Sequence, residues 1–324
     1  MLFCSIQCEE QEKVTINEFN NRIFWEKDKQ GMVELDLFFS NVSDSLLIAA
    51  VGDMDGDKYT DVITVNQERT AFRVFLYNSK SKRFVFGEKE FPTECMISNI
   101  QTIKTTPLEG GLLVTCSRPE SVMKVYIYDD DIHDFVEDTS KRTKIKRDHQ
   151  PFLTDFNGDF YPDILYQDDD GIKIAFHTPE QQNAVIEHFD NFVRQESGVH
   201  KKCHEVNPNR QLATPGSIAY ADVDGDCIAD LLMTTTDGGS GQAYLEVYVS
   251  ILGHYDSEDP TFNFATRYCL VKRTPLPDDM DPVLLFADFD REGMIDVLGF
   301  SPSKKSIYMF KNGLPPRRTG TGTL

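Results

Sequence analysis

Four short stretches of the sequence place oxygen-bearing side chains at positions 1, 3, 5 and 9 of a nine-residue loop. The four loops begin at Asp53, Asp155, Asp222 and Asp288. Alternate residues of a tight loop point to one side, so these oxygens and the main-chain carbonyl at position 7 can surround one hard cation. Calcium accepts about six to eight oxygen ligands in an irregular cage, whereas magnesium requires a stricter octahedron. The spacing therefore predicts calcium as the cofactor of all four loops.

The predicted ligands are the residues at positions 1, 3, 5, 7 and 9 of each loop, with position 7 contributing its main-chain carbonyl. The first loop supplies Asp53, Asp55, Asp57, Tyr59 and Asp61; the second Asp155, Asn157, Asp159, Tyr161 and Asp163; the third Asp222, Asp224, Asp226, Ile228 and Asp230; the fourth Asp288, Asp290, Glu292, Met294 and Asp296. A glycine at position 4 lets the first three loops bend. The fourth loop has Arg291 there and its glycine at position 6, so we expect it to be the weakest site.

The segments that follow the loops distinguish them from EF-hands. An EF-hand shares acidic positions 1, 3 and 5 but needs a glutamate at position 12 and a helix on each side. Position 12 here is Thr64, Tyr166, Met233 or Gly299. An apolar pair follows position 9 in every copy, and such short runs are typical of buried strands. The loops are therefore predicted to connect β-strands.

A common order of segments surrounds each loop. Residues 46–51 are predicted to form a buried strand that leads into the first loop, and alternating side chains over 33–39 predict an earlier strand. Aromatic strands are expected to return after each loop, over 71–77, 172–176, 244–249 and 307–310.

The spacing of the loops predicts a repeat architecture. First ligands are 102, 67 and 66 residues apart, so the long first interval is expected to hold a unit without metal, with strands at 108–115 and 123–128. Repeats of this length with about four strands each indicate propeller blades. The predicted fold class is all-β, a β-propeller with about five units in this chain.

The repeated pattern, a small residue followed by D-x-D-G-D-x-x-x-D and two aliphatic residues, resembles the FG-GAP repeat of integrin α-subunit propellers. Residues 153–164 and 286–290 are similar more particularly to the T-cell immunomodulatory protein family. The resemblance implies FG-GAP blades over residues 16–312 and an extracellular interaction or adhesion module that binds protein partners on a propeller face. Members of that family are single-pass type I membrane proteins, so it also implies an anchor that lies outside this chain. Integrin-type propellers have more blades than the five or so units expected here, so we expect an incomplete ring.

Composition limits the classes of partner. The formal net charge is −20, and four calcium ions would reduce it to about −12. Nucleic acid is not expected as a partner, because phosphate binding needs clustered lysine and arginine. The one basic run, residues 141–147, is interpreted as a solvated loop or edge strand, with an anionic partner as the alternative.

Seven cysteines without a zinc-type spacing are consistent with one or two disulfides in a secreted or luminal protein, or with a reduced protein that has buried thiols. The candidate bridges are Cys95–Cys116 and Cys203–Cys269, with Cys227 free. Asn41 begins a glycosylation sequon, in keeping with a glycoprotein. Residues 1–15 are interpreted as the remnant of a targeting segment, residues 313–324 as a disordered tail, and no run is long enough for a transmembrane helix.

No catalytic constellation is recognisable among the seven histidines or the glycine patterns, so the chain is not predicted to be an enzyme. Residues 178–215 form a long insertion, with a short helix expected over 184–193, and this insertion is the candidate partner-binding loop. Two alternatives stay open: an enzyme acting on polysaccharides or lipids with calcium at the substrate, and a lectin with sugars held between blades. The first requires a cleft with converging titratable groups, and the second requires repeated aromatic pockets.

Overall fold

The computed structural model describes residues 47–81, 83–86, 89–104, 110–129, 131–132, 134–156, 161–176, 185–193, 203–251 and 267–312. The strand expected over 33–39, the segment 1–15, the sequon at Asn41 and the tail 313–324 lie outside these residues. So do two stretches of the insertion, 177–184 and 194–202.

The described residues form five antiparallel sheets, which confirms the all-β prediction. The first sheet contains β1 (Leu47–Gly52), β2 (Asp61–Val65), β3 (Ala71–Asn78), β4 (Arg83–Phe86) and β5 (Phe91–Pro92). The second contains β6 (Met96–Lys104), β7 (Gly110–Arg118), β8 (Val122–Asp129) and β9 (Asp134–Lys144). The third contains β10 (Phe152–Thr154), β11 (Asp163–Asp168), β12 (Gly171–Phe176) and β13 (Val185–His188). The fourth contains β14 (Arg210–Leu212), β15 (Ile218–Ala221), β16 (Asp230–Asp237), β17 (Ala243–Ile251) and β18 (Arg267–Pro275). The fifth contains β19 (Leu284–Ala287), β20 (Asp296–Ser301) and β21 (Ser306–Phe310).

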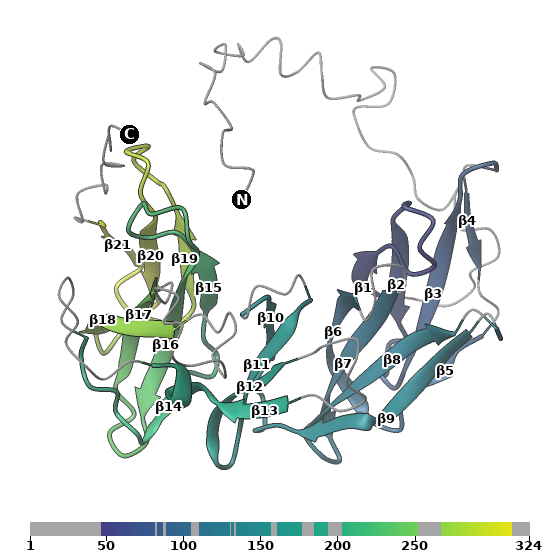
Figure 1. Ribbon diagram of the computed structural model, residues 1–324, viewed down its shortest axis with the longest axis horizontal. Helices are drawn as coiled ribbons and strands as arrows, with labels where there is room; N and C mark the ends of the chain where they lie inside the picture. The colour runs from purple at the N-terminus through teal and green to yellow at the C-terminus, as the bar shows by residue number, and fades with distance from the viewer. Residues whose placement is uncertain are drawn as a thin grey trace, which may run out of the picture.

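Each sheet is a meander in which strands pair mainly with their neighbours in the sequence. Figure 1 shows the sheets placed one after another along an open arc, in the order of the chain. The aromatic strands are found where they were predicted, as β3, β12, β17 and β21. The strands of the expected ligand-free unit are also present, as β7 and β8 of the second sheet.

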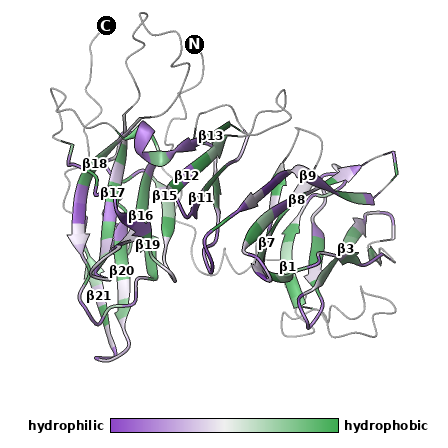
Figure 2. Cartoon of the chain, turned by 90° about the horizontal axis from the view of Figure 1, so that it is seen from below, coloured by the Kyte–Doolittle hydropathy of each residue, from purple (hydrophilic) through white to green (hydrophobic). Residues whose placement is uncertain are grey.

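Apolar side chains fill the space between each pair of neighbouring sheets. Successive residues of a strand point to opposite faces, so one strand serves two cores. Leu112 packs in the core between the first and second sheets, whereas Leu113 packs between the second and third. In the same way, Leu231 of β16 packs in the core between the third and fourth sheets, and Leu232 packs in the core between the fourth and fifth sheets. Figure 2 shows the resulting hydrophobic character of strands such as β17 and β20.

The first strand differs from its prediction. Residues 46–51 were expected to be buried, but Leu47, Ile48 and Val51 of β1 are 46%, 60% and 55% exposed. The reason is its place: β1 is the edge strand of the first sheet, and no described sheet covers its outer face. An apolar sequence predicts the strand but not whether a neighbouring sheet is present on each side.

The helix expected over 184–193 is a wrong prediction. Residues Val185–His188 form strand β13, and only Phe189–Phe192 form a single turn of 3-10 helix, η3. The physical reason is the free edge of β12, to which β13 adds through the pairs from Phe176↔Val185 to Lys173↔His188. Tertiary strand pairing overrides local helical pattern where an open edge lies close by.

Both predicted disulfides are present, Cys95–Cys116 and Cys203–Cys269, and Cys227 is free and exposed. The first disulfide joins the residue before β6 to β7, and the second ties the insertion to β18. Disulfides persist in oxidising compartments, so the pair favours a secreted or luminal protein. The basic run 141–147 begins on β9, an outermost strand, as expected for an edge strand.

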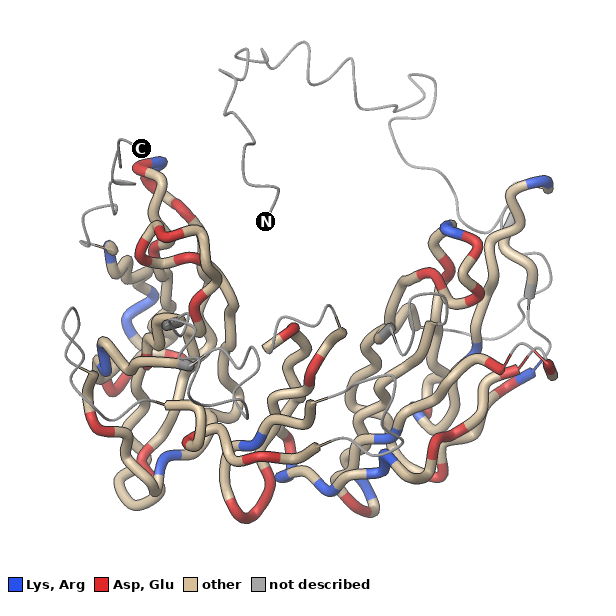
Figure 3. The backbone as a smooth tube through the Cα atoms, in the orientation of Figure 1, with Lys and Arg blue, Asp and Glu red and all other residues tan. Residues whose placement is uncertain are grey.

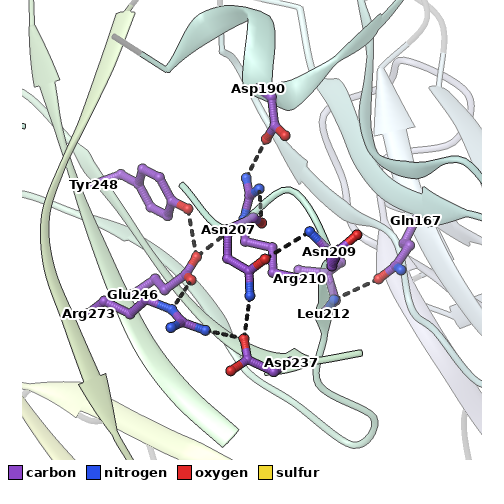
Figure 4. A network of polar contacts seen from close by, with 10 residues as sticks. All are labelled: Gln167, Asp190, Asn207, Asn209, Arg210, Leu212, Asp237, Glu246, Tyr248 and Arg273. Atoms are coloured by element: carbon purple, nitrogen blue, oxygen red, sulfur yellow. Dashed lines mark hydrogen bonds and ion pairs between the residues drawn. The ribbon is translucent and has the colours of Figure 1, made fainter. Parts of the chain in front are cut away.

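A buried network of charges holds the insertion on the fourth sheet (Figure 4). Glu246 of β17 is fully buried and receives ion pairs from Arg210 Nε at 3.4 Å and Arg273 Nε at 3.0 Å, and Tyr248 Oη donates to it at 2.6 Å. Arg210 also pairs with Asp190 of η3 at 2.5 Å. Positive and negative groups thus alternate from the insertion into the sheet.

Candidate metal-binding loops

The four acidic loops occupy the same place in four of the sheets. Each joins two strands that pair with each other: β1 to β2, β10 to β11, β15 to β16 and β19 to β20. In the second sheet the equivalent connection, from β6 to β7, is residues 105–109, which lie outside the described residues. The sequence there contains one acidic residue, Glu109, so a unit without metal stays a prediction.

Carboxylates converge in the three loops that the structure describes in full. Each of three groups of aspartates brings one ligand oxygen per residue within 4.8 Å of the others: Asp53, Asp55 and Asp57; Asp222, Asp224 and Asp230; Asp288, Asp290 and Asp296. In the second loop Asn157 and Asp159 lie outside the described residues, whereas Asp155, Tyr161 and Asp163 are described. Figure 3 shows acidic residues gathered where the first and fourth loops lie, near the two ends of the arc.

The three fully described loops share one backbone conformation. Positions 4 and 6 are both left-handed: φ is 76° and 73° at Gly56 and Lys58, 75° and 66° at Gly225 and Cys227, and 63° and 88° at Arg291 and Gly293. A glycine relieves the strain at one of the two positions in each loop. Moving the glycine from position 4 to position 6 in the fourth loop therefore leaves the turn unchanged.

The position-1 aspartate is held by the main chain at the far side of the loop. Its Oδ2 accepts a hydrogen bond from the N–H of position 6, from Lys58 at 3.0 Å, from Cys227 at 2.9 Å and from Gly293 at 2.9 Å. In the first loop the other oxygen, Asp53 Oδ1, is buried and accepts no hydrogen bond. A buried anionic oxygen without a partner is costly unless a cation is bound. The donor set and this oxygen fit a calcium ion.

The position-9 aspartate has a second role that the spacing did not reveal. All four of these residues are fully buried: Asp61, Asp163, Asp230 and Asp296. Their Oδ2 atoms accept from the N–H of position 2 at 2.8, 2.8, 2.9 and 3.3 Å respectively. In three of them Oδ1 also accepts from the end of the third strand, at Tyr77 N, Ser250 N and Asn312 N. The residue therefore joins the loop to two strands whether or not an ion is present.

Burial of these carboxyl groups makes their ionised form costly. Burial raises the pKa of Asp61 and of Asp230 from 3.8 to about 6, although two backbone N–H groups oppose the shift in each case. The neighbouring carboxylates Asp55 and Asp57 raise the pKa of Asp61 further. At neutral pH each loop thus holds several mutually repelling charges, which a divalent cation would compensate.

Position 2 is apolar in every loop, and in the first three loops it packs the loop against the next sheet. Met54, Phe156 and Val223 are only 1%, 2% and 3% exposed, and each lies in the core shared with the following sheet. Gly110 at the start of β7 permits the close approach, because a Cβ there would lie 2.5 Å from the carbonyl oxygen of Asp53. Phe289 of the fourth loop is 39% exposed, since no described sheet follows the fifth. In the sequence, the apolar residue at position 2, between the first two predicted ligands, was the signal that the loop packs against the next sheet.

Two cavities are lined by described residues, and the first of them reaches the third and fourth loops through Val223 and Ile295. One, of about 590 Å³, lies between the fourth and fifth sheets and is lined mainly by valine and leucine side chains. The other, of about 440 Å³, is bounded by strands of the second to fifth sheets and includes Asp148 and His149. His149 Nε2 is 2.8 Å from Thr214 Oγ1, and His204, which the sequence placed four residues after His200, is exposed on the insertion. His200 itself lies outside the described residues.

Protonation of His149 is expected to destabilise the protein in acid. Burial, with Lys146 nearby, lowers the pKa of His149 from 6.5 to about 4. Between these values the unfolded chain binds more protons than the folded chain, so stability is complete above about pH 6.5 and is lost as the pH falls towards 4. We expect His149→Gln to reduce the acid-induced loss of unfolding free energy between pH 7 and 4.5 by up to about 3 kcal/mol. Chemical denaturation at both pH values measures it. The exposed control His204→Gln should behave like the unmodified chain; an unchanged pH dependence in His149→Gln would contradict the assignment.

The chain is an all-β protein of consecutive antiparallel sheets with acidic loops between the first strands. No protein-family model matches the sequence. Among curated proteins it is similar to the T-cell immunomodulatory protein of Homo sapiens, 24% identical over 288 residues, which cover 82% of this chain and 40% of that protein. It is also similar to the T-cell immunomodulatory protein homolog of Plasmodium yoelii yoelii, 23% identical over 78% of this chain and 37% of that protein. The chain therefore spans about two fifths of the length of these relatives.

Solved structures give more distant likenesses. The WD40 domain of SCAP from fission yeast is matched with a TM-score of 0.40 at 11% identity, over 84% of this chain and 66% of that one. An Agrocybe aegerita lectin that recognises non-reducing terminal N-acetylglucosamine is matched with a TM-score of 0.30 at 12% identity, over 83% of this chain and 80% of that one. Within the described residues there is no helix with the length and apolar composition needed to cross a membrane.

Proposed function

We propose that this chain is a calcium-stabilised β-propeller segment of the FG-GAP type that acts as an extracellular interaction or adhesion module. The observation that carries the proposal is the recurrence of one loop geometry at the same place in the first, fourth and fifth sheets, with three aspartate oxygens converging each time. The orphaned Asp53 Oδ1 supports a cation at the first loop.

The protein's own residues define what the ion would do. Positions 1, 3, 5 and 9 and the carbonyl of position 7 would hold it, and the bound ion would neutralise carboxylates that otherwise repel one another. The hydrogen bonds from position 6 to position 1 orient the first ligand in advance. Because position 2 lies in the core shared with the next sheet, fixing the loop also fixes the junction between sheets.

An extracellular setting and a protein partner are supported by separate features. The two disulfides are typical of secreted or luminal domains. The insertion is the proposed contact surface for the partner. Its described part is fixed by the Cys203–Cys269 disulfide and the Glu246 network, yet Val185 and Ile186 of β13 are 44% and 47% exposed. A rigidly held loop with exposed apolar side chains is suited to binding a protein.

Calcium is expected to raise the melting temperature. Extracellular calcium modules bind at roughly 10⁻⁴–10⁻³ M, so 10 mM calcium should add about 1–3 kcal/mol of stability per occupied loop. Differential scanning fluorimetry with calcium and with chelator measures the effect. Asp224→Ala, which removes a buried ligand, should reduce the calcium-induced rise more than Arg291→Ala, whose side chain is no ligand. An identical melting temperature in calcium and in chelator would refute the proposal.

A further inference from the structure

The ammonium group of a lysine side chain lies beside the acidic residues of the fourth loop. Lys311 follows β21, and its Nζ lies 2.5 Å from Asp290 Oδ2, the position-3 carboxylate. The ammonium group therefore occupies part of the space in which an ion would meet this ligand.

The other loops have an apolar residue at the equivalent position. Lys311 immediately precedes Asn312, whose N–H binds the position-9 aspartate, and Leu76 and Val249 precede the corresponding residues of the first and fourth sheets. In the third sheet the strand register places Phe176 at this point. The basic side chain is thus particular to the fourth loop rather than a general feature of the fold.

The backbone of the fourth loop does not distinguish it from the first and third loops. Its φ angles at positions 4 and 6 and its bond from position 6 to position 1 match those of the first and third loops. Arg291 at position 4 adds a second positive charge beside the four acidic residues. A monovalent charge about 5 Å from a bound divalent ion opposes its binding by roughly tenfold even in water.

We infer that Lys311 supplies to the fourth loop part of the positive charge that calcium supplies to the others, so that this loop keeps its fold without the ion and binds calcium last. The inference rests on the proposed function and adds an order of occupancy to it. The first three loops fill at lower calcium concentration, and the fourth loop responds only at the highest.

Equilibrium dialysis of the full chain against calcium tests this with Lys311→Met and the matched control Lys304→Met, which removes another exposed ion pair of the fifth sheet, to Asp279. We expect the weakest calcium-binding step to tighten about tenfold in Lys311→Met and to stay unchanged in Lys304→Met. Without calcium, Lys311→Met should melt below the unmodified chain, and its calcium-induced rise should be larger.

The outcomes separate the two proposals. If the unmodified chain binds calcium but Lys311→Met leaves every binding step and the melting temperature in chelator unchanged, Lys311 does not compete with the ion and only this inference fails. If the unmodified chain binds no calcium at 10 mM, the proposed function fails and this inference fails with it. A fold check by far-UV circular dichroism on each variant ensures that a loss of binding is not a loss of structure.

Discussion

Glu246→Leu is expected to destabilise the protein by about 3–5 kcal/mol, among the largest effects of any single substitution in this chain. Glu246 is fully buried on β17, and its two oxygens accept contacts from Arg210, Arg273 and Tyr248. Removing the carboxylate leaves the 2%-exposed side chain of Arg210 with one acidic partner, Asp190, in place of two. Removing one partner from a buried ion pair costs far more than the intact pair contributes.

Urea denaturation followed by circular dichroism measures this effect. Glu205→Leu, at an exposed position of the insertion, serves as the control and should change stability by less than about 0.5 kcal/mol. The triple variant Arg210→Met, Glu246→Leu, Arg273→Met should recover much of the loss, because the charges then disappear together. A Glu246→Leu protein as stable as the control would show that the network does not fix the insertion.

Loss of the Cys203–Cys269 disulfide is expected to cost about 4 kcal/mol by the loop-closure estimate. The two cysteines are 66 residues apart in the sequence, so the cross-link removes many conformations from the unfolded chain. Cys95 and Cys116 are 21 residues apart, and the same estimate gives about 3 kcal/mol for that bridge. Removal of Cys203–Cys269, which closes the longer segment of chain, should therefore reduce the unfolding free energy more than removal of Cys95–Cys116.

Paired alanine substitutions at each bridge, compared by guanidinium denaturation, measure the two values. Cys227→Ala is the matched control, since Cys227 is exposed and takes part in no disulfide. It should leave the unfolding free energy within about 0.5 kcal/mol of the unmodified chain. Equal stability with and without Cys203–Cys269 would mean that the Glu246 network alone holds the insertion in place.

Patterns within one strand or loop were enough to predict much of this structure. The apolar pairs and the aromatic runs located the strands, and β3, β12, β17 and β21 lie within a residue or two of their expected bounds. The acidic spacing located the loops, and Asp53, Asp55 and Asp57 do converge. These features are local, because the side chains concerned are neighbours in the chain.

The two disulfides apart, features that depend on distant parts of the chain were not predicted. The edge position of β1 and the pairing of β13 with β12 arise from which sheets and edges lie nearby. The charge network joins Asp190 and Arg210 to Glu246 and Arg273, which no short-range pattern connects. The Lys311–Asp290 pair likewise spans two strands, β20 and β21, and the turn between them. Composition indicated that the chain is acidic, but it did not indicate which basic side chain would contact an acidic loop residue.

The apolar residue at position 2 has a consequence for how the molecule opens. Met54, Phe156 and Val223 each lie next to a candidate ligand in the sequence and within a core that two sheets share. Loss of order in one loop therefore weakens the packing of both sheets that share this core. The protein then behaves as a row of units with nearest-neighbour cooperativity, in which inner units are supported on two sides. Phe289 has no such partner in the described structure, so among the described sheets the fifth, like the first, is supported on one side only.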